Sequence, residues 1–255
     1  MDSTQEAGEG VLAGRVVLIT GANGGLGEAA ARACAAAGAT VVLVGRRVPK
    51  LNKLYDALAS IGPEPAAYPL DLEGAGPEDY ETMAEALRSQ LGRLDGILHA
   101  AVDFKGLTPL ANTAPLDFAR ALHVNLTAPC LLTQACLPLL KQAPDAAVVF
   151  VLDELERIGK AYWGGYGVSK HGLLGLMRIL HDETRDGPVR VSALEPGPMR
   201  TGLRAKAFMN EALNGAPGPG AYAAACVHLL SPAGAAQRGT VHVVREGASP
   251  GQALS

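Results

Sequence analysis

Residues 15–38 read RVVLITGANGGLGEAAARACAAAG, and this stretch decides the fold. Its first part, RVVLIT, is a short apolar run that predicts a buried strand, and its last part, GEAAARACAAAG, is rich in alanine and predicts a helix. A glycine-rich turn between a strand and a helix exposes backbone N–H groups, and the positive end of the helix dipole, to a bound pyrophosphate. The stretch therefore predicts a dinucleotide-binding unit rather than an ordinary glycine-rich turn.

The spaced glycines of this turn have separate roles. Gly21 permits a tight turn, Gly25 leaves room for the close approach of a ligand, and Gly27 lets the helix pack against the sheet. The spacing is G-x-x-x-G-x-G, and glycines alone are a weak signal in a chain that contains 31 of them. The position of the turn directly after the first strand is what makes the prediction specific.

Beyond this unit, short β-branched runs alternate with segments of helix length. Further strands are predicted at residues 40–45, 66–72, 95–101, 146–152, 189–197 and 240–247. Helices are predicted at about residues 49–60, 77–91, 115–141, 162–185 and 219–230. Strands that are apolar on both faces and separated by helices are typical of parallel βαβ units. We predict an α/β fold: a single domain with a doubly wound, Rossmann-like parallel sheet of about seven strands, and ligands at the carboxyl ends of the strands.

The ends of the chain differ in composition from this core. Residues 1–13 are predicted to be a disordered leader, residues 14–247 to form the domain, and residues 248–255 to be a tail. The first ten residues, MDSTQEAGEG, are acidic and polar, which is unlike a signal or transit peptide. No uncharged apolar run approaches the roughly 18–20 residues that cross a bilayer. We expect a cytoplasmic protein.

The overall charge and the cysteines narrow the class of partner. A net charge of −3, with no long basic run, argues against a nucleic-acid partner and against binding to an anionic membrane. A small-molecule substrate is the better prediction. The four cysteines form no C-x-x-C pair and have no nearby histidine at metal spacing. We expect buried, reduced thiols and no metal site.

The end of the second predicted strand, Gly45-Arg46-Arg47, bears on the cofactor. In doubly wound folds an acidic residue about 20 positions after the glycines binds the ribose 2′-hydroxyl of NAD, whereas arginine accommodates the 2′-phosphate of NADP. Here no acid is present, and Arg46 or Arg47 can pair with a phosphate through a planar guanidinium. We therefore favour NADP(H) over NAD(H). The alternative is that both arginines are merely solvated.

A tyrosine and a lysine, Tyr166 and Lys170, lie four residues apart in the predicted helix 162–185. Residues four apart share one helix face, so the lysine places a positive charge beside the phenol. An unperturbed tyrosine titrates near ~10, and a neighbouring cation makes it a more useful acid/base near neutral pH. A solvated surface pair is the alternative, but this helix follows the fifth strand in the same chain as the glycine turn. The pair therefore predicts proton-transfer chemistry.

Together these features resemble the short-chain dehydrogenase/reductase family. The resemblance covers about residues 14–247 and rests on motifs in order along the chain: TGANGGLG (20–27), DL (71–72), HVNL (123–126), YGVSK (166–170) and PGPMRT (196–201). The stretch AYWGGYGVSK is similar to a bacterial oxidoreductase branch of the family. The resemblance implies hydride transfer between a nicotinamide cofactor and a small carbonyl or alcohol. It also implies a homodimer or homotetramer, and a substrate lid at residues 200–220.

The resemblance also implies roles for individual residues. Tyr166 would be the acid/base on the substrate oxygen, Lys170 would bind the nicotinamide ribose and lower the tyrosine pKa, and Asn125 would hold a water of a proton relay. Asp71 and Leu72 would contact the adenine. The remaining cofactor contacts would come from the glycine turn, the chain after the fourth strand and the PGPMRT motif: Gly21, Asn23, Gly24, Gly25, Leu26, Gly27, His99, Ala100, Ala101, Pro196, Gly197, Pro198, Met199 and Thr201.

Asp153 departs from the family pattern, which usually has a serine thirteen residues before the tyrosine. An ionised carboxylate accepts hydrogen bonds and cannot donate one to a substrate carbonyl. At about 4 Å and an effective dielectric of ~20, it would also oppose a Tyr166 phenolate by roughly 4 kcal/mol. Asp153 could be protonated in a closed apolar pocket, could face a cationic group of the substrate, or could mark a site that keeps its cofactor without carbonyl chemistry.

Two functional hypotheses follow. The first is an NADP(H)-dependent oxidoreductase in which Tyr166 transfers the proton, Lys170 and Asn125 support it, and a protonated Asp153 orients the substrate oxygen. The second is an NADP(H)-binding sensor or scaffold with little or no turnover. Two weaker signals stay open: HAAV (99–102) stands where the family commonly has Asn-Asn-Ala-Gly, with His99 expected to be structural, and Trp163 could line the substrate pocket or a subunit contact.

Overall fold

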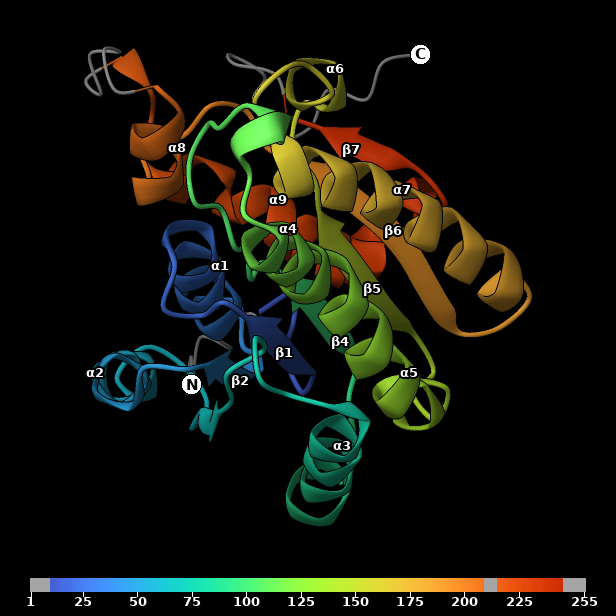
Figure 1. Ribbon diagram of the computed structural model, residues 1–255. Helices are drawn as coiled ribbons and strands as arrows, with labels where there is room; N and C mark the ends of the chain where they lie inside the picture. The colour runs from blue at the N-terminus through green and yellow to red at the C-terminus, as the bar shows by residue number, and fades with distance from the viewer. Residues whose placement is uncertain (1–9, 209–214, 245–255) are drawn as a thin grey trace, which may run out of the picture.

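The computed structural model describes residues 10–208 and 215–244 (Figure 1). Within these ranges the chain forms one seven-stranded sheet. Its strands are β1 (Val16–Thr20), β2 (Thr40–Gly45), β3 (Ala66–Pro69), β4 (Gly96–His99), β5 (Ala146–Val151), β6 (Val189–Glu195) and β7 (Val241–Val243). Every neighbouring pair is parallel, and the order across the sheet is β3-β2-β1-β4-β5-β6-β7. The predicted doubly wound α/β fold is confirmed.

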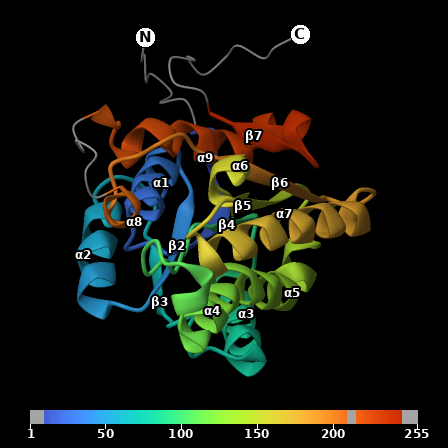
Figure 2. The same ribbon diagram turned by 45° about the horizontal axis from the view of Figure 1, so that its top comes forward.

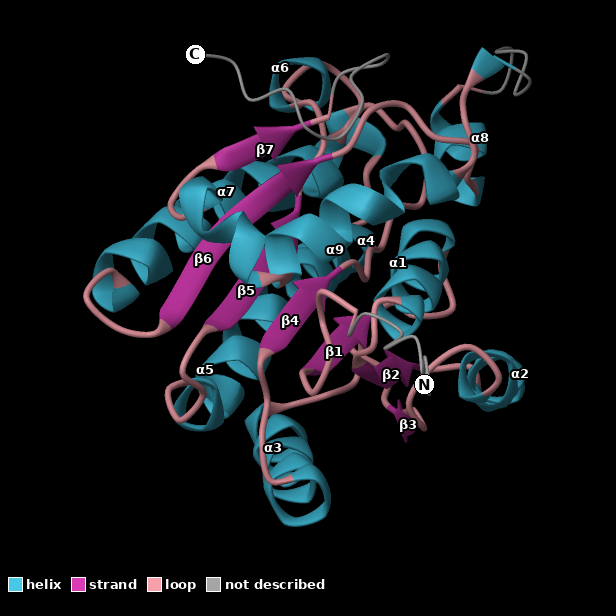
Figure 3. Cartoon of the chain, turned by 180° about the vertical axis from the view of Figure 1, so that it is seen from behind, coloured by secondary structure: helices cyan, strands magenta, loops and turns pink. Residues whose placement is uncertain are grey.

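Helices cover both faces of the sheet (Figure 2, Figure 3). The α-helices of the described ranges are α1 (Gly25–Ala36), α2 (Val48–Ala59), α3 (Pro77–Leu91), α4 (Pro115–Leu122), α5 (Ala128–Leu140), α6 (Leu155–Ile158), α7 (Gly164–Thr184), α8 (Gly202–Ala207) and α9 (Ala223–Leu230). Buried side chains of α1, α2 and α9 pack into one core, and those of α3, α5 and α7 pack into the core on the opposite face. None of the helices in these ranges has the length and apolarity required to cross a membrane.

Strand β1 shows why the sheet forms in this way. Val17 and Ile19 enter the core under α1, whereas Val16 and Leu18 enter the core on the other face. All four side chains are at most 6% exposed. A strand that is buried on both faces must be apolar at every position, which is why the run VVLI shows no polar alternation.

The strand order fixes the place of a ligand. From β1 the chain adds β2 and β3 on one side, and then returns to add β4 on the other side of β1. The loops that leave β1 and β4 therefore separate in opposite directions at their carboxyl ends. In open parallel sheets this reversal point is where ligands bind.

The helix predicted at residues 115–141 is interrupted. The structure has α4, a π-helical turn over His123–Thr127, and α5 in its place. Pro129 lacks the N–H that would bond the carbonyl of Asn125 in a regular α-helix. The Asn125 side chain also accepts a hydrogen bond from the backbone of Asp103 and donates one back to it. A proline and a contact distant in sequence together explain the wider turn.

The remaining differences from the predicted elements lie at their ends. Part of the predicted leader is packed: Leu12 is fully buried, and its N–H donates to the carbonyl of Ala37. Residues 1–9 of the leader, and the tail 248–255, lie outside the described ranges. Strands β3, β4, β6 and β7 are shorter than predicted by two residues or more. Residues 245–247 of the predicted last strand are also outside the described ranges.

Candidate active site

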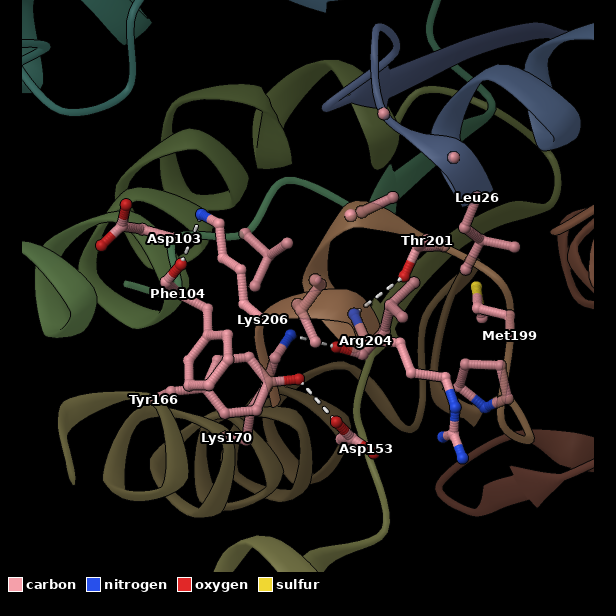
Figure 4. A pocket seen from close by; sticks show the side chains of 18 of the residues that line it. Leu26, Asp103, Phe104, Asp153, Tyr166, Lys170, Met199, Thr201, Arg204 and Lys206 are labelled. Carbon is pink, nitrogen blue, oxygen red and sulfur yellow. Dashed lines mark hydrogen bonds between the residues drawn. The ribbon is translucent and has the colours of Figure 1, made fainter. Parts of the chain in front are cut away.

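Two adjoining cavities lie along the carboxyl ends of the strands. The larger has a volume of about 380 Å³, and Figure 4 shows it from close by. The smaller has a volume of about 260 Å³. The two share wall residues from the glycine turn and from the loops after β2 and β4: Gly24, Arg46, Ala100, Val102 and Asp103. An elongated ligand can therefore extend from one cavity into the other.

The glycine turn fits closely against its surroundings. Gly21 has a φ of +67°, and a Cβ on it would lie 2.6 Å from the Cα of Ala101. A Cβ on Gly27 would lie 2.2 Å from the carbonyl oxygen of Gly21, so the crowding of Gly27 comes from the turn itself. Helix α1 begins after Gly24 without a side-chain cap. Its first N–H groups are left for a ligand that carries negative charge.

The smaller cavity gathers the residues expected around the adenosine end of a dinucleotide. Arg46 and Arg47 line it together with Asp71 and Leu72. Glu73, which was not predicted, lines it as well. Arg46 Nη1 lies 3.9 Å from an oxygen of Asp71 and 3.7 Å from an oxygen of Glu73, and all three side chains are about half exposed. These loose pairs leave the guanidinium able to turn toward a phosphate.

Tyr166 and Asp153 meet in the wall of the larger cavity (Figure 4). The Tyr166 hydroxyl donates to Asp153 Oδ2 at 2.7 Å. Tyr166 is the third residue of α7 and Asp153 follows β5, so a strand end and a first helical turn bring the two side chains together. Burial, followed by the charge of Asp153 and this hydrogen bond, raises the pKa of Tyr166 well above 10. The phenol is therefore protonated near neutral pH.

Lys170 lies in the same wall but does not bond to the phenol oxygen. Its Nζ donates to the Val151 carbonyl at 2.6 Å and stands 5.9 Å from the centre of the Tyr166 ring. The lysine is 3% exposed, and burial lowers its pKa to about 8, with the charge of Asp153 opposing the decrease. Near neutral pH it remains mainly charged, so it supplies a buried positive field beside the tyrosine.

Asp153 has a cationic neighbour that was not predicted. Arg157 Nη2 donates to Asp153 Oδ1 at 2.6 Å, and the backbone N–H of Glu154 donates to the same oxygen at 2.8 Å. A guanidinium stays charged at any pH a protein meets, so Asp153 Oδ1 accepts a hydrogen bond from a permanent cation. The surroundings of Asp153 are therefore not the closed apolar pocket that one of the three alternatives required. The i, i+4 spacing of the two residues was the signal available in the sequence.

The Asn125 side chain is committed to partners within the protein. Its Oδ1 accepts from the backbone N–H of Asp103 at 2.7 Å, and its Nδ2 donates to the Asp103 carbonyl at 2.9 Å and to Ser169 Oγ at 3.1 Å. Ser169 lies on α7 between the tyrosine and the lysine. Asn125 therefore ties the loop after β4 to the helix that carries both.

A family model described as short chain dehydrogenase matches residues 15–212 of the chain. The match includes the glycine turn, the tyrosine–lysine pair and most of both cavities. The chain belongs to the short-chain dehydrogenase family. It is therefore an oxidoreductase by membership, and the predicted family is confirmed.

Relatives of this short-chain dehydrogenase include the uncharacterized oxidoreductase YciK of Escherichia coli strain K12. That protein is 36% identical over 198 residues, which cover 77% of this chain and 78% of YciK. A solved short chain dehydrogenase from Pseudomonas syringae is 40% identical, with a TM-score of 0.87 over 92% of this chain and 96% of the other. One from Shigella flexneri, complexed with NADP, is 32% identical, with a TM-score of 0.88 over 92% and 98% of the two chains.

A nicotinamide dinucleotide fits the residues present in this short-chain dehydrogenase. The uncapped start of α1 and the crowded glycines form a cradle for a pyrophosphate, and the smaller cavity offers arginines to an adenosine phosphate. On the other side, the larger cavity is lined by most of the PGPMRT motif: Pro196, Pro198, Met199 and Thr201. Gly197 is instead turned toward Tyr222, whose hydroxyl would lie 2.7 Å from a Cβ at that position.

Three aromatic rings form one side of the larger cavity. Phe104 stacks on Trp163 with 5.4 Å between ring centres, and Trp163 is 6.3 Å from Phe208. Trp163 therefore lines the pocket, which was one of its two predicted roles. Helix α8, in the described part of the expected lid, adds Arg204 and Lys206 to the same cavity, and residues 209–214 of that lid lie outside the described ranges.

His99 is not part of either cavity wall. It is 2% exposed, stacks on Phe150 with 4.9 Å between ring centres, and shares a 2.8 Å hydrogen bond with Thr133. Burial, with the charge of Lys170, lowers its pKa to about 3, so the ring stays neutral. These contacts agree with the structural role expected for it. Across the described parts of the chain, no group of three or more His, Cys, Asp or Glu side chains is arranged to hold a metal ion.

Proposed function

We propose that this short-chain dehydrogenase uses NADP(H) to interconvert a small carbonyl compound and its alcohol, with Tyr166 as the acid/base. The observation that carries the proposal is the position of the Tyr166 hydroxyl. It lies in the wall of a cavity that also contains the glycine turn and the buried Lys170. When bound, the cofactor supplies or accepts the hydride, and the protein must supply the proton.

The cofactor preference rests on the smaller cavity. Arg46 and Arg47 line it, and the end of β2 offers no acid to a ribose 2′-hydroxyl. Two related solved structures, from Shigella flexneri and Escherichia coli CFT073, are complexed with NADP and NADPH. We expect the 2′-phosphate to draw Arg46 away from its loose contacts with Asp71 and Glu73, because a bidentate phosphate contact is stronger than half-exposed ion pairs.

In the reductive direction Tyr166 donates its proton to the substrate oxygen. The phenol O–H bond breaks and an O–H bond forms on the substrate, which leaves a phenolate. Lys170 stabilises that phenolate through its buried positive charge and binds the ribose of the cofactor. The raised pKa keeps Tyr166 in the donor form near neutral pH. Reduction therefore starts from the resting state of the protein, whereas alcohol oxidation first requires the tyrosine to lose its proton.

Asn125 maintains the path by which the phenolate regains a proton. Its side chain holds the loop after β4, and its carbonyl lacks the helical donor that residue 129 would supply if that residue were not proline. That carbonyl is the acceptor we assign to the relay water beside Lys170. Asp153 Oδ2 accepts from the Tyr166 hydroxyl and holds it until the substrate oxygen replaces Asp153 as the partner.

The experiment has two parts. Calorimetry with NADPH and NADH measures binding, and consumption of NADPH is then followed with a panel of small aldehydes, ketones and diketones. We expect tighter binding of NADPH than of NADH, and turnover of at least one carbonyl compound. Tight NADPH binding with no turnover of any panel member, or of the matching alcohols with NADP⁺, would favour the sensor or scaffold instead.

The oligomeric state and the compartment are also proposals. We propose a homodimer or homotetramer assembled through α7, where Val168 and Ile179 are more than half exposed. Gly172, on the same helix, packs within the chain, because a Cβ there would lie 2.7 Å from Leu126. Light scattering after size-exclusion chromatography measures the state, and Ile179→Glu should shift it toward the monomer. The four free cysteines agree with a reducing compartment such as the cytoplasm.

A further inference from the structure

We infer that Arg157 is a positioning residue: it holds the Asp153 carboxylate and offsets its repulsion of the phenolate that Tyr166 forms. This inference rests on the proposed acid/base role of Tyr166. Proton transfer from Tyr166 leaves a phenolate next to the Asp153 carboxylate. Two negative charges at hydrogen-bond distance repel strongly in a buried site. A cation held on the far side of the carboxylate offsets that repulsion without taking part in the proton transfer.

The two oxygens of Asp153 are used differently. Oδ1 accepts from Arg157 and from the backbone N–H of Glu154, whereas Oδ2 accepts from the Tyr166 hydroxyl. The Asp153 side chain is 16% exposed and that of Arg157 is 28% exposed. The pair is therefore sheltered from solvent but not fully buried. Arg157 fixes the direction in which Oδ2 faces the phenol. The Asp153 carboxylate lies between the positive charge of Arg157 and the Tyr166 hydroxyl.

Arg157 is itself held from several sides. Its Nε donates to Glu154 Oε2 at 3.0 Å. Its guanidinium carbon lies 5.6 Å from the centre of the Trp163 ring and 5.4 Å from that of Phe208. The planar guanidinium of an arginine can lie over two rings and still form two directed hydrogen bonds, which the ammonium of a lysine cannot match. These contacts restrict the side chain of Arg157 to one orientation, as a positioning role requires, whereas a solvated surface arginine has no such restriction.

The other charged groups around Asp153 do not replace Arg157. Lys170, on α7, is a cation near the carboxylate, but its Nζ donates to the Val151 carbonyl, so it does not orient Asp153 Oδ1 as Arg157 does. Glu195, at the end of β6, has its pKa raised by burial and then by Glu154 and Asp153, so it adds negative charge when ionised. Removing Arg157 would therefore leave Asp153, Glu154 and Glu195 near one another without the cation that bonds the first two.

A double-mutant cycle between positions 153 and 157 tests the inference. The variants are Arg157→Met, Asp153→Ser and the double variant, with Arg157→Lys as the charge-conserving change. Glu156→Gln, on the same short helix and exposed, is the control for removing a charge there. Two properties are measured for each: the equilibrium constant of unfolding in urea, and kcat for the panel carbonyl compound that the unmodified protein reduces fastest.

If Arg157 offsets the carboxylate, its loss should matter only while the carboxylate is present. Arg157→Met should then increase the unfolding constant by about tenfold and lower kcat by about tenfold or more, because one unit of pKa corresponds to a tenfold change. In the Asp153→Ser background the same change should have little effect on either property. Arg157→Lys should lose less activity than Arg157→Met, since lysine keeps the positive charge but lacks the planar guanidinium.

An equal effect of Arg157→Met in both backgrounds would overturn the inference, because a role limited to folding α6 does not depend on residue 153. The unfolding arm needs no substrate. If no panel compound is turned over, the proposed function fails, but the unfolding measurements still decide on the inference. Coupling between positions 153 and 157 in unfolding would support the charge offset by Arg157, and no coupling would refute it. The coupling should also shrink at a pH low enough to protonate carboxylates, which a purely steric role would not produce.

Discussion

Replacing Asp153 by serine should make this enzyme oxidise an alcohol with NADP⁺ faster at a given pH. The Asp153 carboxylate lies 2.7 Å from the Tyr166 oxygen. At that distance and an effective dielectric of ~20, it opposes a Tyr166 phenolate by roughly 6 kcal/mol. The positive charge of Arg157 offsets part of this repulsion. We take the net penalty on the phenolate as about 3 kcal/mol, which raises the pKa of Tyr166 by about 2 units.

The sign of the pH effect follows from the raised pKa. Alcohol oxidation needs the phenolate, so below the pKa of Tyr166 the rate rises with pH. Asp153→Ser lowers that pKa, moves the profile to lower pH and raises the oxidation rate at a fixed pH on the order of 10²-fold. The assay is formation of NADPH from NADP⁺ and the alcohol product of the preferred panel compound, followed as a function of pH.

Glu156→Gln removes a charge close in sequence and should leave the profile unchanged. Unchanged or slower oxidation in Asp153→Ser across the pH range, with cofactor binding intact, would refute the reasoning. It would mean that the carboxylate does not set the ionisation of Tyr166.

Three further outcomes are expected. Gly21→Ala should abolish NADPH binding in calorimetry, because its φ of +67° and an Ala101 Cα only 2.6 Å from an added Cβ both oppose a side chain; Gly74→Ala, with open space around it, should bind normally. Arg46→Met should weaken NADPH binding about tenfold while NADH binding stays the same, and equal weakening of both would argue against a 2′-phosphate contact. Since the pKa of His99 is about 3 when folded against 6.5 for an unperturbed histidine, the unfolded chain binds more protons between these values, and stability falls as pH decreases through that window. His99→Phe should flatten this dependence in urea unfolding, and an unaltered slope would exclude His99 as its source.

The fold could be predicted from the sequence because the central strands β1, β4 and β5 are buried on both faces and most connections have helix length. The same reasoning failed in the segment around residues 115–141, where a continuous apolar pattern hides a π-helical turn. Pro129 was visible in the sequence, but the bonds of Asn125 to Asp103 depend on a loop that is 22 residues away in the chain. A local pattern does not contain such contacts.

The candidate active site likewise contains residues that could be predicted from local sequence patterns and others that could not. Tyr166, Lys170 and the glycine turn could be placed because their spacing and their order after particular strands carry the signal. The surroundings of Asp153 could not be placed, because whether Arg157 turns toward the carboxylate or toward solvent depends on Trp163 and on packing around the helix. Glu73 was missed for a similar reason, since its approach to Arg46 is set by the path of the chain after β3.

The most direct test of the central claim is the rate of NADPH consumption by Tyr166→Phe, near neutral pH and with the preferred carbonyl compound. Phenylalanine keeps the ring packed against Phe104 and Trp163 but removes the only proton that Tyr166 can donate. The account predicts a loss of roughly 10²–10⁴-fold in kcat, with NADPH binding measured by calorimetry unchanged. A Tyr166→Phe variant that binds NADPH and keeps the rate of the unmodified protein would contradict it.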